Sequence, residues 1–252
     1  MKVLLIGGCG FIGFNVFQYL NNYKLYKILI VDNLSGQSSK KNYKILKKDY
    51  KRTKVIKADI SNYKKVSEIY NKFKPDAILA LHGQVAVTKS IQNPSIDLNN
   101  NFLSLYNLLN IMREKKSKAK LINLSSNKVY GKIENLKLLE KNLRYHSKKL
   151  INENYSLKFE SPYACSKGSA DQYLLDHAKL YKLNAVSLRL SCVYGENQWG
   201  SEDQGWISWI IKCALLKHKI RIFGNGKQVR DILHVKDLSN LINLLLKRKN
   251  YA

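Results

Sequence analysis

The sequence predicts an α/β fold in which a doubly wound parallel sheet carries a small C-terminal lobe. Through the first 190 residues, short apolar runs alternate with longer amphipathic segments, as strands and helices alternate in parallel sheets. After residue 191 this alternation gives way to a long polar loop and a different succession of segments. The length of 252 residues suits one large domain, or one and a half small ones.

Six apolar runs are candidate strands, and four segments between them are candidate helices. The strands are expected at residues 2–6, 27–31, 54–58, 77–81, 120–124 and 185–190. The helices are expected at about residues 11–22, 62–73, 96–115 and 162–182. Strands that alternate regularly with helices favour a parallel sheet that is covered on both faces.

The C-terminal part is expected to form a smaller lobe. The polar loop SCVYGENQWGSEDQG leads into WISWIIKCALL, which predicts a helix. A strand IRIFG at residues 220–224, a turn at residues 224–226 and a last helix from about residue 235 are expected to follow.

The formal net charge of +26 raises the question of a nucleic-acid partner. The lysines are spread along the whole chain, with only short clusters such as SSKKNYKILKKDYKR, so the charge indicates a compositional bias and leaves an anionic small substrate as the expected partner. No run of 18 apolar residues predicts a membrane span, and the N-terminus is not typical of a signal peptide. The cysteines lack metal-ligand spacing, so we expect no metal site and free thiols in a reducing cytoplasm: Cys9, Cys165, Cys192 and Cys213.

A glycine-rich loop, GGCGFIG, directly follows the first expected strand and opens a helix. It fits GxxGxxG through Gly7, Gly10 and Gly13, and it also fits GxGxxG from Gly8. Such glycines let a pyrophosphate approach the backbone at a helix N-terminus. Asp32 ends the second expected strand nineteen residues after Gly13, where a carboxylate binds ribose hydroxyls and repels a 2′-phosphate. The pattern therefore favours NAD over NADP, although an aspartate at a strand end can also serve a tight turn alone.

The stretch SPYACSKG places Tyr163 four residues before Lys167. On a helix, two residues at this spacing share one face. A nearby ammonium lowers the pKa of a phenol, so the pair could provide a proton acceptor near neutral pH. The alternative is an ordinary tyrosine and lysine on a solvent-facing helix.

Together these motifs resemble those of the extended short-chain dehydrogenase/reductase superfamily, and the resemblance covers essentially the whole chain. It rests on the glycine loop, VDNLSG, ADI (58–60), SSNKVYG (125–131), SPYACSKG and VRDILHVKDL (229–238). HGQVAVTKSIQNP (82–94), SSNKVYG and SEDQGWISW (201–209) are most similar to the CDP-tyvelose (CDP-paratose) 2-epimerase family. Residues 1–190 would then be an NAD-binding Rossmann domain, with residues 225–252 partly packed on it, and residues 191–224 would belong to the substrate-binding lobe.

The resemblance assigns each motif residue a role. The catalytic residues would be Ser126, Tyr163 and Lys167. NAD would lie against Gly7, Gly10, Phe11, Ile12 and Gly13 at its pyrophosphate, Asp32, Asn33 and Ser35 at its ribose, Asp59 and Ile60 at its adenine, and Leu81, Gln84, Asn101, Tyr163 and Lys167 along the remaining channel. A nucleotide sugar would contact Ser126, Asn127, Gln198, Asp203, Gln204, Trp206 and Arg230.

The resemblance implies an NAD-dependent epimerase that inverts C2 of a CDP-dideoxyhexose through transient oxidation. Other readings are a UDP-sugar 4-epimerase or related dehydratase, an oxidoreductase that releases NADH, and an inactive truncated NAD-binding protein. Asn127 and Lys128 stand where dehydratases tend to carry an acidic pair, which argues against dehydration. His82 departs from the small residue usual there. Family members are also longer, so an incomplete substrate lobe is expected. Apolar residues on more than one face of the helices at 96–115 and 162–182 favour a homodimer or homotetramer.

Overall fold

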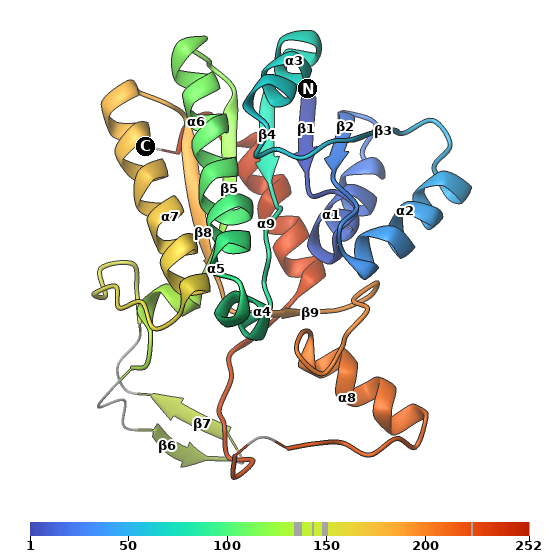
Figure 1. Cartoon of the computed structure of the whole chain (residues 1–252), viewed down its shortest axis with the longest axis vertical. Helices are drawn as coiled ribbons and strands as arrows, with labels where there is room; N and C mark the ends of the chain where they lie inside the picture. Colours follow the sequence, from blue (N-terminus) through green and yellow to red (C-terminus); the bar gives the residue numbers. More distant parts are fainter. Residues whose placement is uncertain (134–137, 143, 148–150, 223, 252) are drawn as a thin grey trace.

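The computed structural model describes residues 1–133, 138–142, 144–147, 151–222 and 224–251. Its centre is a six-stranded parallel sheet with the strand order β3-β2-β1-β4-β5-β8 (Figure 1). The strands are β1 (Lys2–Ile6), β2 (Lys27–Asp32), β3 (Lys54–Lys57), β4 (Ala77–Ala80), β5 (Lys120–Ser126) and β8 (Ala185–Leu190). The predicted doubly wound sheet is therefore confirmed. Its order reverses between β1 and β4, and ligands bind at such a switch point, beyond the carboxyl ends of the strands.

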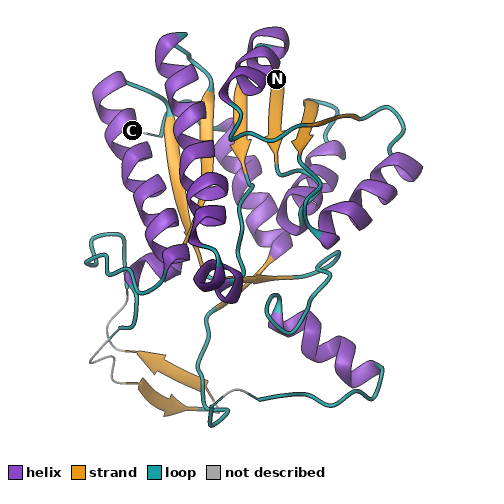
Figure 2. Cartoon of the chain, in the orientation of Figure 1, coloured by secondary structure: helices purple, strands orange, loops and turns teal. Residues whose placement is uncertain are grey.

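Helices cover both faces of the sheet (Figure 2). One face carries α3 (Tyr63–Phe73), α6 (Ser104–Glu114) and α7 (Pro162–Tyr181). The other face carries α1 (Phe11–Asn21), α2 (Gln37–Asp49) and α9 (Val235–Lys247). Successive strand residues point to opposite faces, so β1 sends Leu4 and Ile6 to the first face and Val3 and Leu5 to the second.

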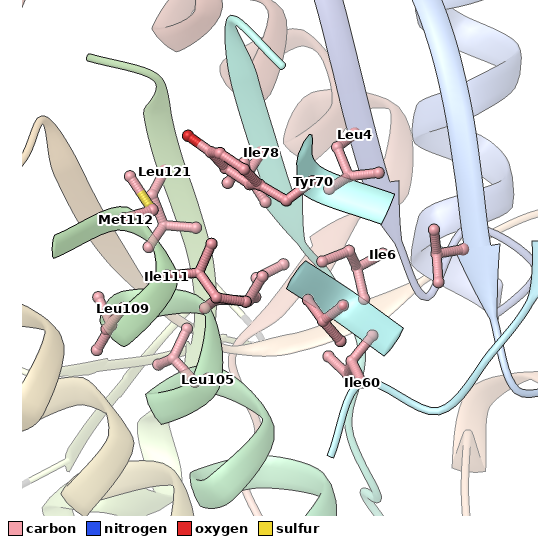
Figure 3. Close-up of a cluster of buried hydrophobic side chains, with 14 of the residues drawn as sticks. Leu4, Ile6, Ile60, Tyr70, Ile78, Leu105, Leu109, Ile111, Met112 and Leu121 are labelled. Carbon is pink, nitrogen blue, oxygen red and sulfur yellow. The ribbon is translucent and has the colours of Figure 1, made fainter. Parts of the chain in front are cut away.

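The core on the first face joins β1, β4 and β5 to α3 and α6 (Figure 3). Leu4, Ile78 and Leu121 come from the three strands, and none of their side chains is more than 1% exposed. Full burial of such a side chain contributes about 1.5–3 kcal/mol, and these contacts fix the helices against the sheet. The core thereby holds the carboxyl ends of the strands in place, where the predicted site residues lie.

The expected helix at 96–115 contains an irregularity that the sequence pattern did not predict. Its first turn is α5 (Pro94–Asp97), followed by a π-helical segment, η1 (Leu98–Leu103), before α6 begins at Ser104. A further short helix, α4 (Val87–Gln92), precedes it. π-helical turns are often found at functional sites, and this one places Asn101 on the inner side of the segment, where it is 3% exposed.

Residues 192–251 return to the sheet after forming a separate extension. β9 (Cys192–Tyr194) pairs in parallel with β10 (Ile232–His234), and α8 (Trp206–Leu215) lies between them in the chain, below the sheet in Figure 1. The last helix, α9, lies against α1: the hydroxyl of Tyr19 donates to Asn240 Oδ1 at 3.0 Å.

The strand expected at 220–224 is wrong where the structure describes it. Residues 220–222 have no strand pairing, and Ile222 is 70% exposed; Phe223 lies outside the described residues. The alternating apolar pattern of that stretch finds no neighbouring strand in the described chain. Conversely, the hairpin of β6 (Leu138–Lys141) and β7 (Arg144–Ser147) was not predicted, because its side chains are mostly exposed and carry no hydrophobic alternation.

Candidate active site

The glycine loop forms a tight turn that has no room for side chains. Gly7 has a φ of +75°, and a Cβ on it would lie 2.7 Å from the backbone of His82. A Cβ on Gly13 would lie 2.1 Å from the carbonyl oxygen of Gly7. α1 begins at Phe11, and its N-cap, Gly10, offers no side chain to satisfy the first N–H groups. The open helix N-terminus and the bare backbone fit a bound pyrophosphate.

Asp32 ties the end of β2 to this loop. Its Oδ2 accepts a hydrogen bond from the backbone N–H of Cys9 at 3.0 Å, and its Oδ1 accepts one from Leu34 at 2.8 Å. The side chain is buried, and burial raises its pKa although the backbone donors oppose this effect. Each carboxylate oxygen can accept a further bond, so the position fits the ribose hydroxyls of NAD.

The residues predicted around the adenosine gather at the carboxyl ends of β2 and β3. Asn33 Nδ2 donates to Asp59 Oδ2 at 3.2 Å, and the backbone N–H of Ser35 donates to Asn33 Oδ1 at 3.1 Å. Burial alone would raise the pKa of Asp59, but bonds from Ser61 and Asn33 hold it below its usual value. Ile60 belongs to the hydrophobic core on the first face of the sheet.

A second group of predicted residues connects β4 to η1 and α7. Leu81, at the end of β4, is 9% exposed. The backbone N–H of Gln84 donates to Asn101 Oδ1 at 3.1 Å, and Asn101 Nδ2 donates to Ser166 Oγ at 3.0 Å. Ser166 lies between the predicted catalytic residues on α7, so this network joins the proposed cofactor channel to the catalytic helix.

Tyr163 and Lys167 lie in the first two turns of α7 and are both buried, at 7% and 6% exposure. The helix begins at Pro162, and Ser161 caps it by accepting a bond from the backbone N–H of Ala164 at 3.1 Å. Proline at the first position and serine at the cap are strong helix-start signals, so the local sequence fixes this register. Because both side chains are buried, the alternative of a solvent-facing pair is wrong.

Ser126 meets Tyr163 across the gap between β5 and α7. It is the last residue of β5, and its side chain hydrogen-bonds the tyrosine hydroxyl. Burial raises the pKa of Tyr163, while the bond from Ser126 lowers it and the nearby Asp97 raises it further. The expectation that Lys167 lowers this pKa below its usual value is wrong for the chain alone, because desolvation of the phenolate outweighs the hydrogen bond from Ser126.

The Lys167 ammonium is held by backbone carbonyls. Its Nζ donates to Leu124 O at 3.0 Å and to His82 O at 3.4 Å. Burial lowers the pKa of Lys167 to about 8, although Asp97 opposes this shift. An ammonium has three donors, so one remains for a ligand such as the ribose of NAD.

His82 lies at the junction of the glycine loop and the catalytic helix. Its Nε2 is 2.8 Å from Ser104 Oγ, and Ser104 in turn donates to Asn100 O at 2.7 Å. This network assigns the proton of the imidazole to Nε2 and leaves the buried Nδ1 without a partner in the described chain. Burial, with a smaller effect from Lys167, lowers the pKa of His82 to about 3, so the ring is neutral.

The predicted substrate residues outside this group lie on more exposed segments. Asn127 begins the 3-10 helix η2 (Asn127–Tyr130), next to Ser126. Gln198 Oε1 accepts from Ser208 Oγ at 2.6 Å, so this side chain anchors α8. The remaining four are exposed and lie on the extension between β9 and β10: Asp203, Gln204, Trp206 and Arg230.

An ion pair that the sequence reasoning missed braces the catalytic elements. Arg189 on β8 donates to Asp171 Oδ2 on α7 at 2.7 Å and to the Tyr130 hydroxyl on η2 at 3.0 Å. The ion pair and the hydrogen bond tie β8 to α7, which carries Tyr163, and to η2, which directly follows Ser126 at the end of β5. A lone arginine inside the apolar run AVSLRL was the available signal.

Known proteins are similar to this chain in architecture and in sequence. The profile of the NAD dependent epimerase/dehydratase family matches residues 3–251. CDP-paratose 2-epimerase of Salmonella typhi is 40% identical over 249 residues, which are 96% of this chain and 73% of that protein. Among solved structures, UDP-glucose 4-epimerase of Thermotoga maritima with UDP-glucose superposes with a TM-score of 0.82 at 27% identity, covering 98% of this chain and 74% of that chain.

A dehydratase has the same fold. dTDP-glucose 4,6-dehydratase of Bacillus anthracis in complex with NAD has a TM-score of 0.81 at 28% identity, covering 99% of this chain and 73% of that chain. The family profile confirms both the resemblance read from the motifs and NAD as the cofactor, which the glycine loop and Asp32 fit. The chain therefore belongs to the NAD dependent epimerase/dehydratase family.

Proposed function

We propose that this chain epimerises a nucleotide sugar by transient oxidation, with C2 of a CDP-dideoxyhexose as the inverted carbon. One observation supports the chemistry above all others: Tyr163, Ser126 and Lys167 are buried together at the carboxyl end of the sheet, beside a loop that fits the pyrophosphate of NAD. The likeness to CDP-paratose 2-epimerase supports the choice of sugar and carbon.

In the proposed reaction, the Tyr163 phenolate takes the proton of the sugar hydroxyl while a hydride leaves the carbon that bears it, which yields a ketone. Ser126 donates a hydrogen bond to the reacting oxygen. The ketone then turns in the site and receives the hydride on its other face, while Tyr163 returns the proton. When bound against the glycine loop and Lys167, NAD would supply the acceptor for this hydride. Acid–base catalysis by a tuned group is commonly worth about 10²–10⁴ in rate.

The protein supplies the conditions that this proton transfer requires. The pKa of Tyr163 is raised by burial, so the phenolate must gain stabilisation from positive charge in the occupied site. Lys167 lies one turn along the same helix and keeps a free donor. Because the fixed backbone acceptors Leu124 O and His82 O hold Nζ, the ammonium can orient a ribose without moving.

The other site assignments belong to the same proposal. Residues 191–224 would form part of the substrate lobe. The nucleotide sugar would contact four of its residues and Arg230, which lies just beyond them: Gln198, Asp203, Gln204 and Trp206. A homodimer or homotetramer would form through α6 and α7, whose outer side carries the half-exposed Tyr173 and Leu175. A cytoplasmic location would suit an enzyme that binds NAD and whose four cysteines are free thiols. Among the described helices, none has the length and apolar character of a membrane span.

The proposal is tested by offering the protein CDP-paratose and UDP-glucose in separate reactions with NAD. NMR of the products should show conversion of CDP-paratose to CDP-tyvelose and no change in UDP-glucose. Formation of UDP-galactose would favour the 4-epimerase alternative, which the likeness to the Thermotoga maritima enzyme keeps open. A dehydrated 4-keto sugar would instead indicate dehydratase chemistry. Tyr163→Phe serves as the matched inactive control.

A further inference from the structure

A buried carboxylate that the proposed mechanism does not use lies next to the catalytic helix. Asp97 ends α5 and is 0% exposed. Its Oδ2 has no hydrogen-bond partner in the described chain, and its Oδ1 accepts only a long bond, from Asn101 Nδ2 at 3.4 Å. Burial of a carboxylate with so few donors costs folding free energy, so stability alone does not explain why this residue is an aspartate.

The hydrogen bonds of Asn101 connect Asp97 to the catalytic residues. The same Nδ2 that reaches Asp97 also donates to Ser166 Oγ at 3.0 Å, and Ser166 Oγ donates to the backbone carbonyl of Tyr163 at 2.9 Å. Ser166 directly precedes Lys167 in α7. The carboxylate therefore orients the amide that braces the first turn of the catalytic helix.

We propose that Asp97 is a positioning residue for the proposed epimerisation: through Asn101 and Ser166, its buried carboxylate holds the first turn of α7 and places a negative charge beside Tyr163 and Lys167. A buried negative charge stabilises a neighbouring ammonium and destabilises a neighbouring phenolate. Both effects are present, since Asp97 raises the pKa of Lys167 and that of Tyr163.

Of the charged groups around Tyr163 and Lys167, Asp97 is the carboxylate that changes the pKa values of both. From α7, Asp171 is equally buried but is bound to Arg189 two turns away from Tyr163. From the loop after β4, the neutral His82 meets Lys167, and Asp59 acts on His82. From α4, Lys89 is exposed. Among the carboxylates that the structure describes, Asp97 is the one that shifts the pKa of Lys167.

Asp97→Asn separates the charge of this residue from its shape, because an amide oxygen can still accept the bond from Asn101. The primary readout is the 13Cε signal of Lys167 during a pH titration of the full chain, assigned by its absence in Lys167→Met. In the parent protein this signal should titrate near pH 8. In Asp97→Asn its midpoint should fall by about one pH unit, a size that a nearby charge commonly produces.

Asp171→Asn is the matched control. It also neutralises a buried aspartate of the same region, but it should leave the Lys167 midpoint where it is in the parent protein. Thermal melting checks that each variant folds, and Asp97→Ser replaces Asp97→Asn if the latter does not melt cooperatively. An unchanged or higher midpoint in the folded Asp97 variant would overturn the proposal.

A second readout rests on the proposed function. With CDP-paratose as substrate, the acid and alkaline limbs of the kcat profile should both move to lower pH in Asp97→Asn, because the phenol and the ammonium both lose their protons more readily. A merely structural role would lower kcat without moving the limbs. The NMR titration needs no sugar, so a chain that fails to epimerise CDP-paratose yet shows the midpoint shift would overturn the proposed function but not the effect of Asp97 on Lys167.

Discussion

His82 should make the protein lose stability in mild acid. Its side chain is half-buried with a fully buried Nδ1, its Nε2 is bound to Ser104, and a positive charge on the ring would face Lys167. Burial is the main reason that its pKa falls from 6.5 to about 3. In the unfolded chain the imidazole regains an ordinary pKa and takes up a proton below pH 6.5. A folded-state pKa below the unfolded value means that stability is lost as the pH falls between these two values.

The size of the effect follows from linkage. At pH 7 the unfolded imidazole is mostly neutral, and the difference in protonation lowers the free energy of unfolding by only about 0.2 kcal/mol. At pH 5 the unfolded state is protonated and the folded state is not, which lowers the free energy of unfolding by about 2 kcal/mol. His82 therefore removes nearly 2 kcal/mol between the two pH values, a large part of a typical stability of about 5–15 kcal/mol.

The assay compares His82→Gln with the parent protein by urea unfolding at pH 7 and pH 5. Glutamine keeps a donor for Ser104 and cannot be protonated. The variant should gain about 2 kcal/mol relative to the parent protein on going from pH 7 to pH 5, whatever its stability at pH 7. His146→Gln, at an exposed position, controls for the loss of one histidine. A difference between His82→Gln and the parent that is the same at both pH values would refute the reasoning.

Four other predictions test the site and the assembly. Tyr163→Phe should lower turnover by about 10²–10⁴ and leave the NAD Kd within a few-fold, since the phenyl ring fills the same space; full activity would contradict the catalytic role. The carboxylate of Asp32 should make NAD bind at least about ten-fold more tightly than NADP in a tryptophan-fluorescence titration, and equal affinities would count against its ribose contact. Gly13→Ala should abolish NAD binding, because the added Cβ would lie 2.1 Å from Gly7 O. Leu180, on α7, is 61% exposed. Leu180→Lys should give monomers in sedimentation where the parent chain forms dimers, and a monomeric parent chain would contradict the dimer proposal.

The sheet could be predicted because each strand contains a short apolar run that lies between two helical layers. All six runs that carry this pattern became strands, and β5 extends two residues beyond its apolar part, since Ser125 and Ser126 still pair with Arg189 and Leu190 of β8. The helix α2 could not be read in the same way. It is rich in lysine and buries only Ser39, Asn42 and Leu46, so its apolar face is too narrow to give a periodic signal.

Motif spacing predicts which residues of the site share an element, but not how deeply they are buried. Spacing placed Tyr163 and Lys167 on one helical face, but it contains no information on burial, which is why the direction of the Tyr163 pKa was wrong. It also missed Asp97. That residue follows a proline turn among polar residues and gives no local sign that it is fully buried, because its burial comes from the packing of α5 against α4, η1 and α7.

Transient oxidation of the inverted carbon is most directly tested with CDP-paratose that carries deuterium at C2. If the hydride leaves C2 and returns to the same carbon, the CDP-tyvelose product should retain the deuterium at C2, and NADH should not accumulate during turnover. Loss of the deuterium to solvent in the epimerised product would show that the carbon is inverted by proton exchange. That result would contradict the role assigned to NAD and to the Tyr163–Lys167 pair.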